Sequence, residues 1–285
     1  MARLGGDVTA SSEALETADE KRMSFFEHLE ELRKRLKVLI LAFVLAFIVF
    51  MTFGFQYGVL GLPIWLPIPV LDPRHVIASQ FLNAVRSYLI PPDIETIVLT
   101  PWEAIVVQFK AALFLSAVAT SPIITYEFWA FVGPALKPKE KRLIVRVSTP
   151  VVALFLLGVA MSFAIVLPFT IPFLYDIARG IGVTALFQLT EFLDFVLLFS
   201  LAFGLAFELP VIMYGLSVLG TVQPEFWKRN WRYAAIAIFV FGAFITPDGS
   251  GITMMLVALP MLALYVAGYY AARLRQIRRN RAKTS

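Results

Sequence analysis

The side chains best equipped for chemistry in this chain are a few carboxylates, cations and aromatic rings that interrupt long apolar runs. Glu31 stands among basic residues that include Arg33 and Arg35. Glu140 lies in a second charged segment, nine residues after Phe131. A carboxylate accepts two parallel hydrogen bonds from the planar fork of a guanidinium, so this set suits recognition of an arginine-containing ligand. Phe131 would add an aromatic face beside the bound cation.

Each of these glutamates also has a purely structural interpretation. Glu31 is four residues before Arg35, which is the spacing of a weak ion pair on one helix face. Glu140 follows Pro138, and a proline with an acidic residue is typical of the first turn of a helix. The residue pattern alone leaves both interpretations open.

Three further charged side chains lie within or beside apolar segments: Glu103, Lys110 and Glu208. Charges at the depth of a membrane are costly and usually face a protein-lined interior, so each is a candidate for function. Glu103 and Lys110 are seven residues apart and share one helix face. Glu208 stands two residues before Pro210, where a kink would let a carboxylate line a concave surface. The alternative is a protonated, hydrogen-bonded acid that only holds helices together.

Covalent and metal-dependent catalysis lacks its usual residues. The chain has no cysteine and only two histidines, His28 and His75, both outside the apolar segments. No G-x-S-x-G sequence is present, so a serine–histidine mechanism also lacks its parts. We expect no enzymatic activity, no cofactor and no metal site.

The elements that must position these residues are membrane-spanning helices. Of the 285 residues, 59% are apolar and 16% are charged, which is less charge than an ordinary soluble domain carries. A helix needs about 20 apolar residues to cross the hydrocarbon core. Six segments predict an all-α integral membrane protein: residues 38–56, 111–126 with extensions on both sides, 147–175, 195–224, 233–247 and 249–272.

The fifth and sixth of these segments are expected to be short helices. A cluster of turn-forming residues at 246–251 separates them. As a helix, residues 233–246 would extend about 21 Å, which is less than the ~30 Å hydrocarbon core. Such a short span thins the bilayer locally or lies against other protein.

The distribution of lysine and arginine predicts how the chain is oriented in the membrane. Residues 1–37 contain seven, residues 137–146 five, residues 225–232 three and the segment after residue 272 six, which makes 21 of the 25. Positive residues accumulate on the cytoplasmic side of a membrane protein. We therefore expect a multi-pass protein of the cell membrane with both termini in the cytoplasm. Because the charge follows this topology, it does not indicate nucleic-acid binding.

Three regions follow from these patterns. Residues 1–22 are expected to form a disordered cytoplasmic tail, and residues 273–285 a basic cytoplasmic tail. Residues 23–272 form the six-helix domain, which includes an amphipathic cytoplasmic helix at 24–36 whose apolar residues recur every three or four positions. The first apolar segment is too long for a cleavable signal peptide, so we expect a permanent first span.

Several motifs together resemble the TatC family, the multi-span core of the twin-arginine protein translocase. The resemblance covers the chain from about Ser24 to Arg273. One specific part is the stretch from His28 to Arg35. A second is the pattern Pro122, Tyr126, Trp129, Phe131, Pro134, Leu136, Glu140 and Arg142. Later family signatures match at residues 207–210, 246–248 and 259–260.

The resemblance implies a receptor for signal peptides that carry paired arginines on folded cargo. Glu31 and Glu140 would receive those arginines at the cytoplasmic face. Arg33, Arg35 and Phe131 would shape the same site.

The resemblance also implies an architecture and a set of partners. Glu208 would face the concave side of a glove-like bundle. Single-span TatA- or TatB-type proteins would dock near the short fifth and sixth helices, and other copies of this chain would join the assembly. The proton-motive force would drive export. The partner-docking residues would be Thr246, Pro247, Asp248 and Met254.

The chain departs from the family pattern at the start of its sixth span. The family commonly has Thr-Pro-Pro-Asp there, followed by a polar glutamine. This chain has a single proline, Pro247, before Asp248, then a Gly-Ser-Gly insert, and Met254 where the glutamine would fall. A polar partner contact at this position therefore lacks its side chain.

From the residues alone, the alternative function is a small-molecule secondary transporter. Glu103, Lys110, Glu191 and Glu208 would then form a substrate path near the membrane midplane. The chain shows no repeated halves, however, and its most specific motifs lie near the cytoplasmic rim.

Overall fold

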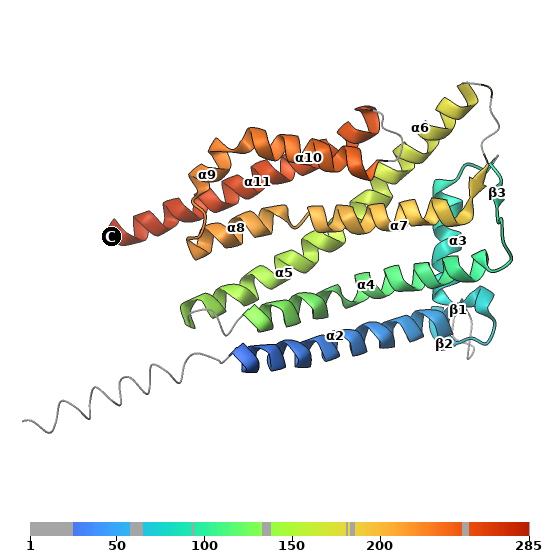
Figure 1. Cartoon of the computed structure of the whole chain (residues 1–285), viewed down its shortest axis with the longest axis horizontal. Helices are drawn as coiled ribbons and strands as arrows, with labels where there is room; N and C mark the ends of the chain where they lie inside the picture. The colour runs from blue at the N-terminus through green and yellow to red at the C-terminus, as the bar shows by residue number, and fades with distance from the viewer. Residues whose placement is uncertain are drawn as a thin grey trace, which may run out of the picture.

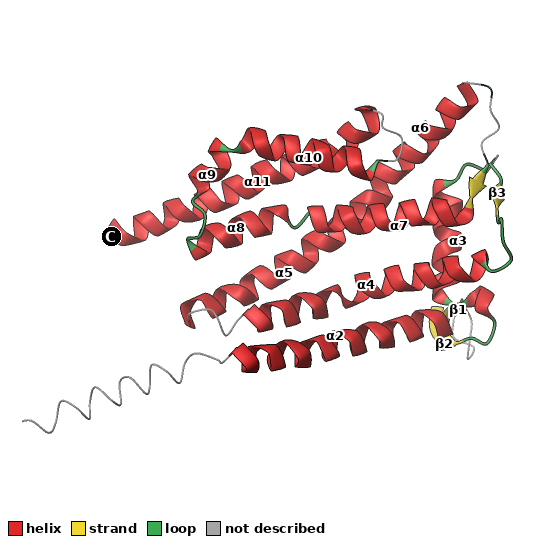
Figure 2. Ribbon diagram, in the orientation of Figure 1, coloured by secondary structure: helices red, strands yellow, loops and turns green. Residues whose placement is uncertain are grey.

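The computed structural model describes residues 25–57, 65–92, 94–132, 138–180, 182, 186–246 and 251–284. In this part of the chain, long helices form a bundle and short strands connect some of them (Figure 1, Figure 2). The helices are α2 Phe25–Thr52, α3 Ile77–Leu89, α4 Glu103–Val132, α5 Pro138–Met161, α6 Leu167–Gly180, α7 Leu189–Ala206, α8 Leu209–Leu219, α9 Pro224–Arg229, α10 Trp231–Ile245 and α11 Gly251–Thr284. A 3₁₀ turn, Pro73–His75, precedes α3, and a π-helical turn, Ser162–Val166, joins α5 to α6.

Two small sheets correct the all-α prediction. Strand β1, Phe53–Tyr57, pairs antiparallel with β2, Trp65–Pro69. Strand β3, Thr96–Ile97, pairs parallel with β4, Phe187–Gln188. These strands lie in the connections between helices, where backbone N–H and C=O groups have no helical partner and must find another. The all-α prediction is therefore confirmed for most of the apolar sequence. It is wrong for two connections and for the end of the predicted first segment, where residues 53–56 belong to β1.

Five of the described helical segments are long and apolar enough to cross a membrane. They are Phe26–Thr52, Glu103–Phe131, Thr149–Gly180, Leu189–Val218 and Gly251–Ile277. The remaining apolar helix, α10, has 15 residues, so the predicted fifth segment is short as expected. The structure thus matches a mostly helical, multi-pass membrane protein.

The expectation of a short sixth helix is wrong. Helix α11 has 34 residues and continues from the apolar segment into the basic end of the chain. Its last residues are mainly arginine, alanine, leucine and lysine, which favour helix, and no glycine or proline interrupts them after residue 268. The predicted boundary at residue 273 therefore lies inside a continuous helix.

The first helix also joins two segments that the sequence suggested separately. The amphipathic stretch at 24–36 continues without a break into the first span within α2. Leu29, Leu32 and Leu36 are exposed along its first turns. The apolar side chains of this stretch are thus available to lipid or to a partner.

Helix α4 lies at the centre of one half of the bundle. It packs against α2, α3, α5 and α7, whereas α11 packs against α8 and α10. A row of phenylalanine rings runs along α7. The rings of Phe195 and Phe199 are tilted with centroids 5.4 Å apart, and those of Phe199 and Phe203 are stacked with centroids 5.7 Å apart. The packing of α4 against α7 fixes the relative positions of the charged side chains that the two helices carry.

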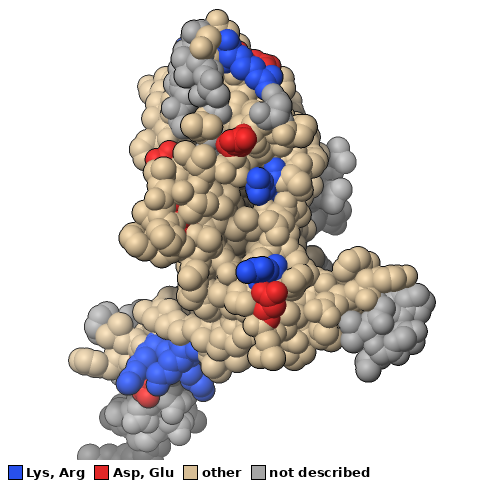
Figure 3. Space-filling view, turned by 90° about the vertical axis from the view of Figure 1, so that its right-hand side faces the viewer, with Lys and Arg blue, Asp and Glu red and all other residues tan. Residues whose placement is uncertain are grey.

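The two ends of the bundle differ. The beginning of α2, the beginning of α5, helix α9 and the end of α11 lie at one end, and α3 and the strands lie at the other (Figure 1). Figure 3 looks at the end that carries α3 and shows scattered acidic and basic side chains on a mostly uncharged surface. The start of α2 and the end of α11 thus lie at the same end of the bundle (Figure 1).

Candidate functional site

Two of the predicted recognition residues of the first helix, Glu31 and Arg35, lie with His28 on the side of α2 that faces α4. His28, Glu31 and Arg35 are separated by three and four residues, so they share one helix face. All three side chains are partly buried, whereas their neighbours Glu30 and Arg33 are exposed. Helix periodicity and packing against α4 together bring these three side chains to one place.

Arg35 joins two carboxylates from different helices. Its Nε donates to Glu31 Oε1 at 3.0 Å, and its Nη1 donates to Glu127 Oε2 on α4 at 2.9 Å. The exposed fractions of the Arg35, Glu31 and Glu127 side chains are 24%, 18% and 12%. Two carboxylates thus share one guanidinium in a half-buried position, which leaves the cluster with a formal charge of −1.

One oxygen of this cluster is unused. Glu31 Oε2 is buried and has no hydrogen-bond partner among the described residues. A buried polar atom without a partner is costly, and a charged oxygen more so. The position therefore favours a further donor, and a guanidinium fits because it can bond to a carboxylate through two N–H groups.

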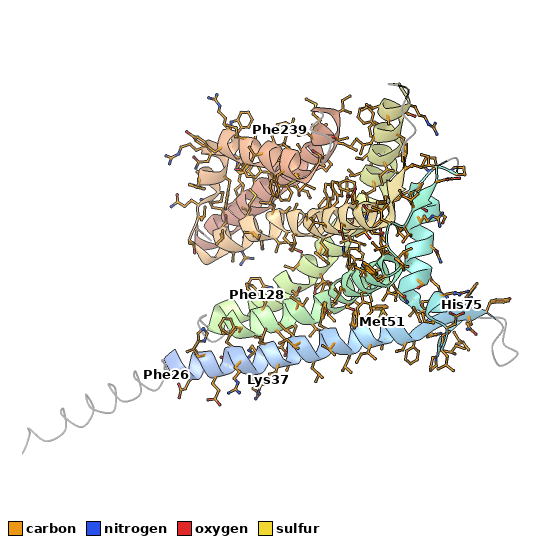
Figure 4. The ribbon with its side chains drawn as sticks, turned by 45° about the vertical axis from the view of Figure 1, so that its right-hand side comes forward. Phe26, Lys37, Met51, His75, Phe128 and Phe239 are labelled. Carbon is orange, nitrogen blue, oxygen red and sulfur yellow. The ribbon has the colours of Figure 1, made fainter. Side chains whose placement is uncertain are left out.

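An aromatic pair borders the cluster on its open side. The ring of Phe131 stacks on that of His28, with centroids 4.4 Å apart and planes at 19°. Phe131 is four residues after Glu127, so both lie on the same face of α4. We call His28, Glu31, Arg35, Glu127 and Phe131 the carboxylate cluster. In Figure 4 the ends of α2 and α4 that carry it are marked by Phe26 and Phe128.

One predicted member, Arg33, lies apart from the carboxylate cluster. Arg33 is exposed and stands two residues from both Glu31 and Arg35, which places it on the other side of the helix. Lys37, one turn further along, points away from the other helices in Figure 4. Glu140 lies in the first turn of α5, and its side chain is outside the described part of the structure.

Glu127 is a member of the cluster that sequence reasoning missed. It lies within an apolar span, four residues before Phe131, and between Lys110 and the charged segment at 137 no other residue of α4 is charged. A carboxylate alone in such a span is a signal of function or of an ion pair. The signal was present, but its partner on α2 could not be read from spacing.

Glu103 has a structural role at the opposite end of α4. Its carboxylate accepts hydrogen bonds from the backbone N–H of Leu99 at 2.7 Å and from the N–H and hydroxyl of Thr190 at 3.1 and 2.7 Å. The side chain thus satisfies the segment that precedes its own helix and ties the start of α4 to the start of α7. It is buried and fully engaged, so it provides no free carboxylate for a substrate path.

Lys110 is paired with a residue on a neighbouring helix. Its Nζ lies 2.7 Å from both carboxylate oxygens of Asp194 on α7. The partner of Lys110 thus lies on another span. Glu191 is exposed one turn earlier on α7. Because Glu103 and Lys110 both serve helix–helix contacts, the transporter alternative loses two of its four residues.

Glu208 lies at the break between α7 and α8. The break precedes Pro210, in agreement with the predicted kink. Its Oε1 is buried and has no hydrogen-bond partner among the described residues. The hydrogen-bonded alternative is thus not found for this oxygen.

The predicted partner-docking residues are used partly inside the fold. Thr246 is buried, and its hydroxyl donates to the carbonyl of Gly242 at 2.9 Å. Met254 packs against the same Gly242 from α11. Pro247 and Asp248 lie outside the described residues. Thr246 thus closes the end of α10, and Met254 contributes to the contact between α10 and α11.

Together, these features define a class of protein: a multi-pass α-helical membrane receptor whose conspicuous polar site is a carboxylate cluster near one end of the bundle. Within that class the chain belongs to the TatC family. The profile of this family, described as "Sec-independent protein translocase protein (TatC)", matches residues 27–260. Members of this family are subunits of a protein translocase and are not enzymes.

Relatives of known name agree along most of the chain. The chain is 39% identical over 260 residues to "Sec-independent protein translocase protein TatC" of Cenarchaeum symbiosum, covering 89% of this chain and 96% of that protein. It is 33% identical to the protein of the same name from Aquifex aeolicus, covering 88% and 95%. A crystal structure of the "Twin Arginine Translocase Receptor- TatC" superposes with a TM-score of 0.68 at 31% identity, covering 87% of this chain and 99% of that one. The chain is therefore a translocase receptor subunit of this family.

Proposed function

We propose that this chain binds the paired arginines of twin-arginine signal peptides at its cytoplasmic face. Glu31 and Glu140 receive the two guanidinium groups, and Arg33, Arg35 and Phe131 shape the site. Binding commits folded cargo proteins to export driven by the proton-motive force. Glu127 joins this set because it shares Arg35 with Glu31.

The observation that carries the proposal is the unused, buried oxygen of Glu31 in a cluster of negative charge. Arg35 already shows how a guanidinium bridges α2 and α4 there. An incoming arginine can pair with Glu31 Oε2 without displacing Arg35, and the stacked Phe131 ring lies within the same cluster. The residual negative charge also favours a cationic ligand over a neutral one.

The proposal includes an orientation for the whole chain. The six predicted spans place both termini, including residues 1–22 and 273–285, in the cytoplasm. In support, the end of the bundle that carries the carboxylate cluster also carries the beginning of α2 and the end of α11 (Figure 1). It also carries α9, whose last turn contains Lys228 and Arg229, as positive residues on a cytoplasmic face would.

Single-span TatA- or TatB-type proteins and further copies of this chain are the proposed membrane partners. The supporting feature is a row of exposed apolar residues on the short helix α10: Tyr233, Ile236, Val240 and Phe244. Their spacing of three and four residues puts them on one face, which a partner helix could cover. Glu208 faces the concave side of the bundle, and Thr246, Pro247, Asp248 and Met254 position the docking region.

Charge reversal tests the recognition site directly. We expect Glu31→Lys to lower the affinity of the detergent-purified chain for a twin-arginine signal peptide at least about tenfold, because it replaces the accepting carboxylate by a cation. Glu140→Lys should do the same. Glu30→Lys is the matched control, since Glu30 is exposed on the same helix, and it should bind like the wild type. Unchanged binding by both Glu31→Lys and Glu140→Lys would show that the site is elsewhere.

The contribution of Glu127 is tested with a milder change. Glu127→Gln keeps the shape of the side chain but removes the charge that holds Arg35 to α4. We expect peptide affinity to fall by roughly three- to tenfold, as for loss of a charge-assisted hydrogen bond. Fluorescence anisotropy of a labelled signal peptide measures the change. Wild-type affinity in Glu127→Gln would limit this residue to a structural role.

A further inference from the structure

A polar pocket lies at the end of the bundle remote from the carboxylate cluster. It has a volume of about 260 Å³ and lies between the 3₁₀ turn, α3, the start of α4 and the start of α7. Its polar lining consists of Arg74, Ser79, Asn83 and Gln108. Apolar side chains, among them Ile105, form the rest of the wall. None of these residues takes part in the function proposed above.

The corner of the pocket that carries Arg74 is held in place by hydrogen bonds. The carbonyl of Pro73 accepts from Ser79 Oγ at 2.8 Å and from Gln108 Nε2 at 2.9 Å, so side chains of both α3 and α4 bind it. Gln108 is itself buried. The backbone that positions Arg74 is thus fixed on two sides, which reduces the cost of ordering that side chain around a ligand.

The pocket is positively charged. Among its described lining residues Arg74 is the one charged side chain, and no carboxylate of the described residues lies within ion-pair distance of its guanidinium. The nearby Asp72 is not part of the lining. Its carboxylate accepts from the backbone N–H of Arg74 at 3.0 Å and pairs with His75 Nδ1 at 3.1 Å. The charge of Asp72 acts on Arg74 from nearby without a direct ion pair, so the Arg74 guanidinium can bind an anion, with amide and hydroxyl groups nearby.

The position of the pocket matches the headgroup layer of a bilayer. Helix α4 has 30 residues and is about 45 Å long, close to the full thickness of a bilayer with its headgroups. The pocket takes its α4 residues from positions 104–108, within the first two turns. An exposed tryptophan, Trp102, stands just before them, as expected at a membrane interface.

An apolar path leads from the pocket along α4. Ile105 lines the pocket and is 58% exposed, and Phe109 and Leu113 continue its row at four-residue spacing, both exposed. A free phosphate ion would make no favourable contact with these apolar side chains. The acyl chain of a lipid would cover it, with its phosphate beside Arg74.

We propose that this pocket binds the phosphate of a phospholipid headgroup in the leaflet remote from the carboxylate cluster. Arg74 pairs with the phosphate through its guanidinium, and the Asn83 amide donates to the phosphate. The Ser79 hydroxyl, which already donates to Pro73, accepts from a hydroxyl group of the headgroup. Ile105, Phe109 and Leu113 contact the acyl chain. The bound lipid fills the gap between α3 and α4 and secures the end of the bundle opposite the receptor site.

Native mass spectrometry of the detergent-purified full chain, with added phosphatidylglycerol, tests this site. We expect one retained lipid per chain, and Arg74→Gln should lower the retained fraction by about fivefold or more because the charged partner of the phosphate is lost. Arg86→Gln is the matched control, since Arg86 is exposed on α3 outside the pocket, and it should retain the lipid like the wild type. Equal retention in Arg74→Gln and the wild type would overturn the proposal, as would equal losses in both variants.

Two further probes separate the possible sources of the phosphate. Diacylglycerol has the acyl chains without the phosphate and should show no retention that depends on Arg74. Inorganic phosphate at millimolar concentration should leave the phosphatidylglycerol bound. Retention of diacylglycerol equal to that of phosphatidylglycerol by the wild type would show an apolar groove only, and displacement of the lipid by inorganic phosphate would show a site for the free ion. Both variants should elute from size exclusion like the wild type, which confirms that they fold.

Discussion

At the scale of single residues, two ion pairs fasten α4 to different neighbours at its two ends. Glu127 reaches Arg35 on α2, and Lys110 reaches Asp194 on α7. Each pair joins residues more than 80 positions apart in the chain. The two sites differ in the net charge that remains after pairing. Lys110 and Asp194 balance each other, whereas the Arg35 cluster has an additional carboxylate, so only the latter suits a cationic ligand.

Breaking the Lys110–Asp194 pair should destabilise the bundle modestly. Asp194→Asn leaves the Lys110 cation without its partner at the edge of the membrane. Since the two side chains are 32% and 51% exposed, we expect a loss of only about 1 kcal/mol or less in unfolding free energy. Thermal unfolding followed by circular dichroism in detergent measures the effect as a lowered midpoint.

Two companion variants make that measurement specific. The charge exchange Lys110→Asp with Asp194→Lys should restore most of the loss, because the pair reforms with opposite polarity. Glu191→Gln removes an exposed charge from the same helix and should leave the midpoint unchanged. If the exchanged double variant is as unstable as Asp194→Asn, the pair contributes nothing through charge.

At the scale of elements, α5 and α7 meet at a point where only glycine fits. A Cβ atom added to Gly204 would lie 2.8 Å from Val159 Cγ2, and one added to Gly158 would lie 2.9 Å from the Cα of Gly204. Beside this contact, the hydroxyl of Ser162 donates to that of Ser200 at 2.9 Å. Small residues that allow backbones to approach closely are typical of helix contacts in membranes. This contact brings α5 and α7 close together beside the phenylalanine row of α7.

Enlarging this contact should separate the two helices. We expect Gly204→Val to lower the unfolding free energy by about 1–3 kcal/mol, as for overpacking of a core. Gly215→Val on α8 is the control, since a Cβ added at Gly215 meets nothing within 4 Å. Both changes introduce a valine into a helix, so the difference between the two thermal unfolding midpoints measures the cost of overpacking at the contact between α5 and α7. Equal midpoints would mean that α5 and α7 adjust without cost.

Hydropathy predicted where the apolar helices lie, but it did not predict how far each helix extends. The apolar runs correctly indicated α4, α7 and the short α10, because burial in lipid is a local property of the side chains. The length of α11 was not predicted. The amphipathic stretch was expected to lead into the first span, but hydropathy did not show that the two form one continuous helix, α2. Both depend on whether a helix continues beyond the membrane, and hydropathy carries no signal for that once the residues become polar.

At the scale of the whole molecule, the proposed orientation can be measured because the natural chain has no cysteine. We expect Ser87→Cys, exposed on α3, to react with a membrane-impermeant maleimide added to intact cells. Glu225→Cys, exposed on α9, should react only after the membrane is opened. The cysteine-free parent is the control for background. Labelling of position 225 in intact cells would reverse the proposed topology.

The sequence by itself determined the membrane class, the apolar segments and the family resemblance, because each rests on composition or on motifs that are contiguous or nearly so. It also placed Glu31, Arg35 and Phe131 among the candidates. Only the tertiary structure decided which charges meet: it paired Arg35 with Glu127 across 92 positions and Lys110 with Asp194 across 84. The physical reason is that such pairs depend on how helices pack and rotate against each other. That packing is set by the shapes of many side chains, such as the glycines between α5 and α7, and no local pattern records it.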